Sequence, residues 1–163
     1  MTNPSRPALA LLCAAALAAL SGCAQPAEAP ATEEQEAEAA ALTVSNARIV
    51  LPPVAGNPAA VYFDLSYSGA PGITLDNVGV EGAGTTMIHD YAEEAGAMRM
   101  VMADSVRLGG DAPVRFAPGG LHAMAMEPSD ALRAGGTAKV TLTLSNGATT
   151  VIEAPVRAAG EER

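Results

Sequence analysis

The feature that most restricts the fold is a succession of short apolar or alternating stretches, separated by turn-forming residues, from residue 42 onward. Among the separating pairs, Asn146-Gly147 is the clearest, because it can supply both positive φ angles of a type I′ hairpin turn. Only residues 129–133 suggest a helical turn. The pattern therefore predicts a single all-β domain over residues 42–163, an antiparallel sandwich or barrel. The expected strands cover residues 42–51, 60–67, 73–80, 85–91, 97–103, 114–116, 121–126, 138–145 and 149–154.

The first residues have the composition of a targeting signal. Arg6 is followed by an apolar run over residues 8–20, which is short for a helix that spans a bilayer, and then by Leu20-Ser21-Gly22-Cys23. This tetrapeptide resembles a bacterial lipobox. The resemblance implies that residues 1–22 are a lipoprotein signal peptide and that Cys23 is lipidated, which would anchor an exported protein on a membrane. The alternative is an ordinary cleaved signal peptide with an incidental cysteine.

Residues 23–41 are expected to join the lipidated Cys23 to the domain as an acidic tether rich in Ala, Glu and Pro. The stretch has few large apolar side chains to bury, so we expect it to be solvated, with transient helix at its alanine-rich end. By resemblance to Gram-negative lipoproteins, the absence of Asp at position 24 favours the outer membrane over the inner one. The expected location is therefore periplasmic or extracytoplasmic, on a lipid anchor.

Charge and cysteine content exclude several classes of protein. The formal net charge is −9, and residues 42–163 keep 13 acidic and 8 basic residues, whereas a nucleic-acid-binding protein needs a basic face to neutralise phosphates. Cys13 would leave with the signal peptide and Cys23 would be acylated, which leaves no thiol for a disulfide framework or a zinc site. The sequence has no nucleophile elbow, no paired His-Glu metal motif and no phosphate-binding Gly-Lys loop, so we do not expect an enzyme.

Both histidines, and every methionine except the first residue, lie between positions 87 and 126. Residues two apart in a strand share a face, so these side chains form three same-face sets on three expected strands. Neutral imidazoles with thioethers suit Cu(I) better than Zn(II), Mg(II) or Ca(II). The alternative is that the methionines only fill the core, for which Met is well suited. The three sets are Met87 with His89, Met98 with Met100 and Met102, and His122 with Met124 and Met126.

Four of these residues follow the spacing His-x10-Met-x21-His-x-Met, at His89, Met100, His122 and Met124. This spacing, with the turn Pro118-Gly119-Gly120 before the second histidine, resembles the periplasmic copper chaperones of the PCuAC family over residues 44–157. The resemblance implies a cupredoxin-like antiparallel β-sandwich with Greek-key topology. It also implies that these four side chains hold one Cu(I) per domain near the surface.

The resemblance further implies a carrier, expected to be a monomer, that delivers copper to a respiratory oxidase during assembly of its CuA centre, or to another copper chaperone. A blue-copper electron-transfer site is excluded, because it would need a cysteine thiolate. Two alternatives stay open. One is a lipoprotein for copper storage or resistance, and the other is a structural β-sandwich lipoprotein that binds no metal.

Overall fold

The computed structural model describes residues 32–110 and 112–161, which form one short helix and ten strands. Every strand expected from the sequence is present, and β6 is an addition. Residues 129–132 form a single turn, closed by a hydrogen bond from Leu132 N–H to the carbonyl of Ser129 at 3.1 Å. The elements are α1 Glu33–Ala40, β1 Leu42–Val50, β2 Ala59–Tyr67, β3 Thr74–Val80, β4 Thr85–Glu94, β5 Ala97–Met102, β6 Val106–Arg107, β7 Val114–Phe116, β8 His122–Met126, β9 Thr137–Leu144 and β10 Thr149–Arg157.

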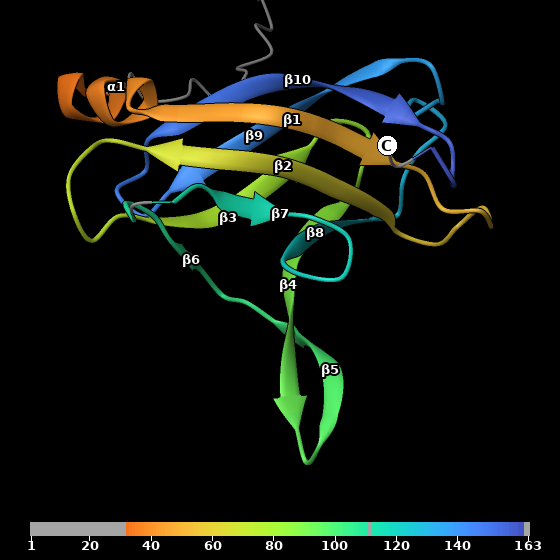
Figure 1. Cartoon of the computed structure of the whole chain (residues 1–163). Helices are drawn as coiled ribbons and strands as arrows, with labels where there is room; N and C mark the ends of the chain where they lie inside the picture. The colour runs from red at the N-terminus through yellow and green to blue at the C-terminus, as the bar shows by residue number, and fades with distance from the viewer. Residues whose placement is uncertain (1–31, 111, 162–163) are drawn as a thin grey trace, which may run out of the picture. The chain divides into compact units, whose positions relative to one another are not determined.

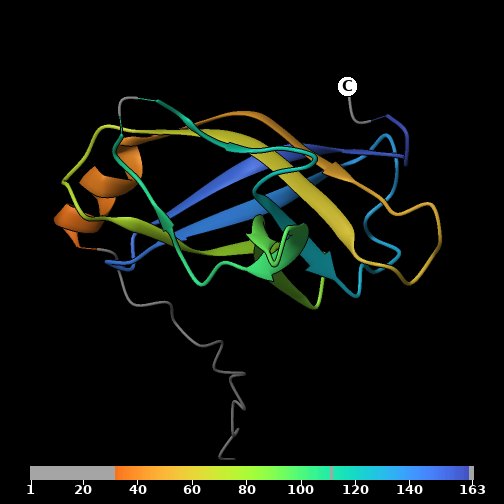
Figure 2. The same cartoon turned by 60° about the horizontal axis from the view of Figure 1, so that its bottom comes forward.

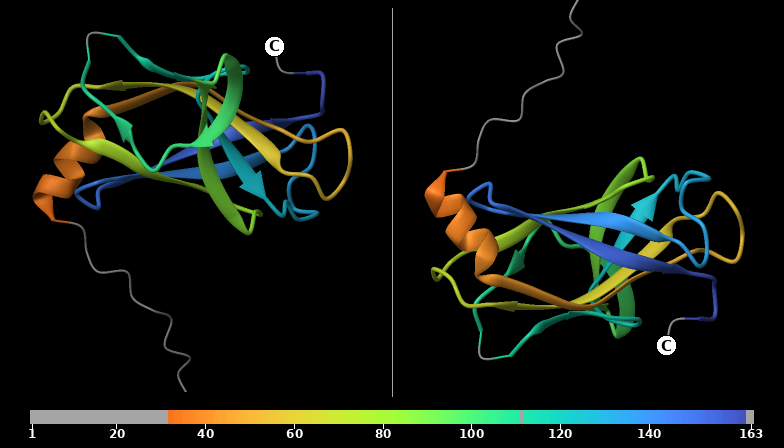
Figure 3. Two further views of the ribbon diagram at one scale, coloured as in Figure 1. Left: turned by 90° about the horizontal axis from the view of Figure 1, so that it is seen from below. Right: turned by 90° about the horizontal axis from the view of Figure 1, so that it is seen from above.

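The strands form two layers that share one continuous set of hydrogen bonds, in the order β5-β4-β8-β2-β1-β10-β9-β3-β6, with β7 paired to β2 (Figure 1; Figure 3). The first layer holds β5, β4, β8, β2, β7 and β1, and the second holds β10, β9, β3 and β6. A short parallel pairing of β1 with β10, at Ile49↔Val156 and Val50↔Arg157, joins the layers, and all the other pairings are antiparallel. The predicted antiparallel β-sandwich is therefore confirmed.

The core lies between the two layers and follows the alternation of the strands. In β2, alternate residues from Ala59 to Leu65 are buried, and β9 alternates in the same way from Ala138 to Leu144. The chain has two phenylalanines, and they stack in this core: the ring centroids of Phe63 and Phe116 are 4.1 Å apart. Each fully buried large apolar side chain stabilises the fold by about 1.5–3 kcal/mol relative to an exposed one.

The hairpin between β9 and β10 differs from the predicted type I′ turn. Leu144 N–H donates to the carbonyl of Ala148 at 2.8 Å, so the loop has three residues rather than two. Gly147 has a φ of 84°, whereas Asn146 is not among the residues with positive φ. The Asn146 side-chain oxygen instead accepts a hydrogen bond from Ala148 N–H at 3.0 Å. A three-residue loop with one glycine in the left-handed region is also compatible with the right-handed twist of the two flanking strands.

The described end of the expected tether is helical, and none of the helix residues is buried. Residues 33–40 form α1, whose N-terminus is closed by a capping box between Thr32 and Gln35. The helix is hydrogen-bonded to the β-domain: Thr150 Oγ1 donates to the carbonyl of Ala39 at 3.3 Å, and the hydroxyl of Tyr67 donates to the carboxylate of Glu38. The helix and the β-domain therefore belong to one compact unit.

The predicted signal peptide at residues 1–22 and the lipidated Cys23 lie outside the described residues. Within the part of the chain that the structure describes, no helix is long and apolar enough to span a membrane.

Candidate metal centre

Strand β4 takes part in two pairings that meet at His89. Its first half pairs with β8, from Thr85↔Met126 to His89↔His122, and its second half pairs with β5, beginning at His89↔Met102. Beyond His89, strands β4 and β5 leave the layers as a hairpin that projects from the domain (Figure 1), and Figure 2 shows this hairpin from its tip. We call it the β4–β5 hairpin.

The two histidines lie side by side at the base of this hairpin. His89 lies opposite His122 on one side and opposite Met102 on the other, so the three residues form one row across β8, β4 and β5. The ring centroids of the two imidazoles are 5.8 Å apart. Residues opposite each other in antiparallel strands share a face, with Cβ atoms about 4.5–5.5 Å apart. This row is the centre of the candidate site.

The predicted methionines lie in the rows on either side of the histidines. Met124 is opposite Met87 in one neighbouring row, and Met100 is opposite Tyr91 in the other. Met124 and Met100 are each diagonal neighbours of His89 on an adjacent strand. Backbone positions in this relation are about 7–8 Å apart, a distance that long side chains can bridge. The structure therefore places all four predicted residues on one face of three adjacent strands.

The structure also adds residues to this face that the motif does not contain. Met102 and Met87, whose role the sequence left open, lie directly opposite His89 and Met124. Sequence reasoning missed Tyr91, whose ring centroid is 5.9 Å from that of His122, although its position two residues after His89 was the signal that could have identified it. Met98 and Met126 lie one row further out on either side.

The methionines of this face are more exposed than the residues of the core. The core-facing residues of β4 and β8 are Ile88, Ala123 and Ala125, and the methionines alternate with them on the outer face. On β5, the exposed fraction is 63% for Met98 and 64% for Met102. Core filling does not account for side chains that face solvent.

The two imidazoles differ in their surroundings. His122 is 6% exposed, and its Nδ1 lies 2.7 Å from the carbonyl oxygen of Gly120. A carbonyl has no hydrogen to donate, so Nδ1 carries a proton, and in the neutral imidazole Nε2 keeps a lone pair for a ligand. Burial, and then the nearby charge of His122, lower the pKa of His89, which favours the neutral form that binds metals. The Nδ1 atom of His89 is shielded from solvent and has no hydrogen-bond partner among the described residues.

The donor set is soft. Within residues 32–110 and 112–161, no group of three or more His, Cys, Asp or Glu side chains is arranged to hold a metal ion. A metal at this face would therefore take nitrogen from the two imidazoles and sulfur from thioethers. Such a set favours a soft, monovalent ion over Mg(II) or Ca(II).

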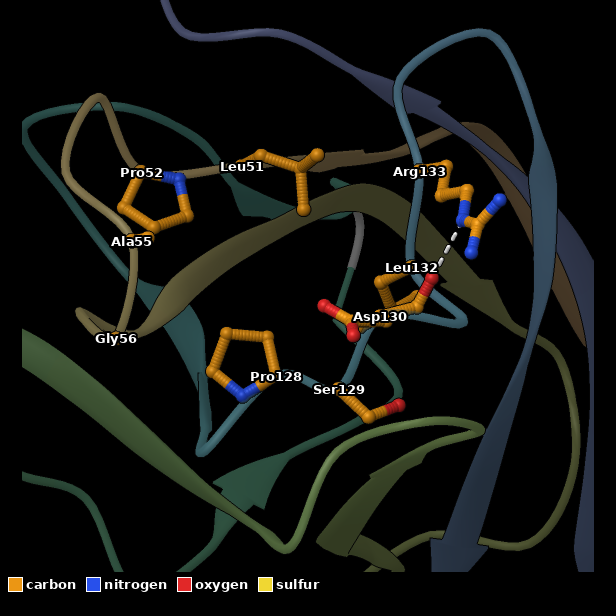
Figure 4. A pocket seen from close by; sticks show the side chains of 9 residues that line it. All are labelled: Leu51, Pro52, Ala55, Gly56, Pro128, Ser129, Asp130, Leu132 and Arg133. Carbon is orange, nitrogen blue, oxygen red and sulfur yellow. Dashed lines mark hydrogen bonds between the residues drawn. The ribbon is translucent and has the colours of Figure 1, made fainter.

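A pocket of about 300 Å³ lies elsewhere, between the loop after β1 and the loop after β8 (Figure 4). Its walls include Leu51, Pro128 and Leu132, and the Nε of Arg133 donates to the carbonyl of Asp130 at 2.7 Å. No histidine or methionine lines it, so it is separate from the candidate metal centre.

Comparison with known proteins agrees with this architecture. A family model described as "Putative lipoprotein LpqE-like" matches residues 42–156. A solved structure, the copper-bound PCuAC domain from PmoF2, is 21% identical, with a TM-score of 0.59 over 72% of this chain and 93% of that one. The solution structure of the Cu(I) form of DR1885 from Deinococcus radiodurans is 25% identical, with a TM-score of 0.56 over 79% of this chain and 88% of that one.

The apo PCuAC domain from PmoF1 is 24% identical, with a TM-score of 0.57 over 72% of this chain and 94% of that one. These similarities confirm the predicted cupredoxin-like β-sandwich. A search of curated proteins found no match.

Proposed function

This chain belongs to the LpqE-like family, and we propose that it is a copper chaperone that carries one Cu(I) ion outside the cytoplasm. The observation that carries the proposal is the row of His122, His89 and Met102 on the outer face, with further methionines in the rows beside it. The copper-bound PCuAC domain from PmoF2 and the Cu(I) form of DR1885, which have the same fold, support the choice of metal.

The proposed ligands are His89, Met100, His122 and Met124. The imidazoles would bind first through neutral nitrogens, because the carbonyl of Gly120 fixes the tautomer of His122 and burial lowers the pKa of His89, which favours its neutral form. The thioethers would complete the site without releasing a proton, since they carry none. Thioethers also resist binding of hard ions, so the site would select Cu(I).

The position of the site favours delivery over storage. Its β5 side chains are exposed on the β4–β5 hairpin, so an acceptor could approach the ion directly. Transfer would proceed by exchange of ligands, with a thiolate or imidazole of the acceptor replacing each thioether or imidazole in turn. Because thiolates bind Cu(I) more strongly than thioethers do, transfer to a thiolate site such as CuA in a respiratory oxidase, or to another chaperone, would be favourable.

The place of action is a further part of the proposal. Residues 1–22 would direct export, and acylation of Cys23 would hold a monomeric carrier on a bacterial membrane, more specifically on the outer membrane. Mass spectrometry of the mature protein tests this: the expected product begins at an acylated Cys23, and an unmodified N-terminus at another residue would contradict it.

An anaerobic Cu(I) titration against a chromophoric competing chelator tests the site. We expect one ion per chain, and we expect the double variant Met100→Leu with Met124→Leu to bind at least about tenfold more weakly for each lost thioether, about 1.4 kcal/mol each. The matched control is Met98→Leu with Met126→Leu, which removes two thioethers from the outer rows and should bind as the unmodified protein does. Equal affinity for all three proteins would show that the ligand assignment is wrong.

Two further measurements on the same proteins distinguish a copper chaperone from a structural lipoprotein and from a storage protein. A structural lipoprotein without metal would show no rise in melting temperature with Cu(I), whereas a ligand that binds only the folded state raises it. A storage protein would keep its copper when mixed with an apo CuA domain, whereas a delivery protein would transfer it.

A further inference from the structure

A second candidate site lies along β1, β2 and β7, and it shares no residue with the metal centre. It is a cleft of about 390 Å³, and three of its lining residues are arginines from three different strands: Arg48 of β1, Arg115 of β7 and Arg157 of β10. We call it the arginine cleft. The β-domain holds 13 acidic and 8 basic residues, so this gathering of positive charge runs against its overall sign.

One carboxylate, that of Asp64, also lines the cleft, but it is engaged by an uncharged partner. Its Oδ2 accepts a hydrogen bond from Nδ2 of Asn46 at 2.8 Å. Within the part of the chain that the structure describes, no carboxylate lies at salt-bridge distance from Arg48 or Arg115. The lining therefore has Arg48 and Arg115, without a carboxylate partner among the described residues, beside Arg157, whose Nη1 donates to the carbonyl of Glu161 at 3.2 Å.

The backbone beside the cleft is irregular in a way that holds Arg48 in place. The pairing of β1 with β2 shifts register between Ser45 and Arg48, and Asn46 within this bulge has a φ of 55°. Arg48 Nη1 donates to the carbonyl of Asn46 at 3.2 Å, and its guanidinium carbon lies 4.9 Å from the ring centroid of Tyr62. Bulges and left-handed residues other than glycine are costly, and they are frequent where a strand must direct a functional side chain.

Arg48 keeps one donor unused despite these contacts. Its Nε is shielded from solvent and has no hydrogen-bond partner among the described residues. A buried donor without an acceptor destabilises the fold. Arg48 is thus both held in position and incompletely satisfied.

We propose that the arginine cleft binds a phosphate group, either free or as part of a lipid headgroup. A carboxylate has two oxygens and is usually matched by one guanidinium fork, whereas a phosphate presents three or four oxygens that several guanidinium groups can share. Guanidinium groups from three strands around one cleft suit the second geometry. This proposal does not depend on copper binding.

The test uses the metal-free full chain with Cys23→Ser, which prevents acylation, and inorganic phosphate as the probe. Titration at constant ionic strength, followed by calorimetry, should saturate with one site. Arg48→Gln with Arg115→Gln should weaken phosphate binding at least tenfold. The matched control, Arg107→Gln with Lys139→Gln, removes the same charge from exposed positions outside the cleft and should change affinity less than twofold. Circular dichroism checks folding, and Arg115→Gln alone, at an exposed position, is the variant to use if the double variant does not fold.

A variant that should tighten phosphate binding, rather than weaken it, gives a further test. Asp64→Asn keeps an oxygen that can accept from Asn46 but removes the negative charge, so it should tighten phosphate binding severalfold. A residue with only a structural role would not improve binding when it is replaced.

Sedimentation with phosphatidylcholine vesicles, with and without phosphatidic acid, distinguishes the two sources of phosphate. Saturation by inorganic phosphate supports a free ligand, and arginine-dependent binding to the phosphatidic acid vesicles alone supports a headgroup. Absence of both, or an equal loss of binding in the Arg107/Lys139 control, would overturn the proposal.

Discussion

At the scale of single residues, the candidate metal centre separates groups that are fixed from groups that can exchange. His122 is buried and its tautomer is set by the carbonyl of Gly120, whereas the methionines of β5 are exposed. A carrier needs both properties, because the fixed imidazole retains the ion while an exposed thioether can give way to an acceptor.

Met102 is the residue at which register and motif lead to different expectations. The spacing of the motif identifies Met100, yet Met102 lies directly opposite His89. We expect Met102→Leu to weaken Cu(I) binding about tenfold, equivalent to about 1.4 kcal/mol, because its sulfur can reach an ion held by His89. Met98→Leu, opposite Glu93, is the control and should have less than a twofold effect. Chelator competition measures both, and equal affinities in the two variants would exclude Met102 as a ligand.

At the scale of elements, the β4–β5 hairpin presents half of the site, and its turn is strained. The two-residue turn between Glu94 and Ala97 has positive φ at both positions, 52° at Ala95 and 81° at Gly96. This is the geometry that favours Asn-Gly, and an alanine in the left-handed region costs roughly 1–2 kcal/mol relative to its usual conformations.

Ala95→Asn should therefore stabilise the hairpin, by about 0.5–1 kcal/mol after allowing for the partial tolerance of asparagine. Amide hydrogen exchange of β5 is the measurement, because opening of a projecting hairpin precedes global unfolding. Gly96→Ala is the matched opposite: no atom lies within 4 Å of the added Cβ, so only the φ of 81° opposes it, and β5 should exchange faster. Faster exchange in Ala95→Asn would contradict the strain argument.

The same element shows what sequence could and could not predict. Alternation located the strands, because each has one face in the core, and period two placed Met100 and Met124 on a face with the histidines. The types of the hairpin turns were not predicted correctly. Asn146-Gly147 lies in a three-residue loop, while two successive positive φ angles occur at Ala95-Gly96, where the alanine does not indicate such a turn. Cross-strand register and the docking of α1 depend on tertiary contacts, such as Tyr67 with Glu38, that no local pattern encodes.

At the scale of the whole domain, the core and the candidate metal centre use opposite faces of the same strands. In β4 and β8, the buried apolar residues are Ile88, Ala123 and Ala125, and the His and Met side chains alternate with them on the other face. Ligand exchange at the outer face therefore does not require the core to open. The arginine cleft lies on other strands, where β1 and β7 of the first layer meet β10 of the second.

This separation predicts that stability and copper affinity respond to different substitutions. Leu142→Ala, at a fully buried position in the second layer, should destabilise the domain by about 2–5 kcal/mol, because it loses buried area and leaves a cavity. The folded fraction should still bind Cu(I) within about twofold of the unmodified protein, since His89 and His122 keep their register. Urea unfolding and chelator competition on the same samples measure the two quantities.

The converse pair, Met100→Leu with Met124→Leu, should lose copper binding and keep its unfolding free energy within about 1.5 kcal/mol, as volume-conserving Leu for Met exchanges do. If affinity instead fell in step with stability across both variants, the metal centre would depend on the core as a whole, and a carrier built in that way could not release its ion without partial unfolding.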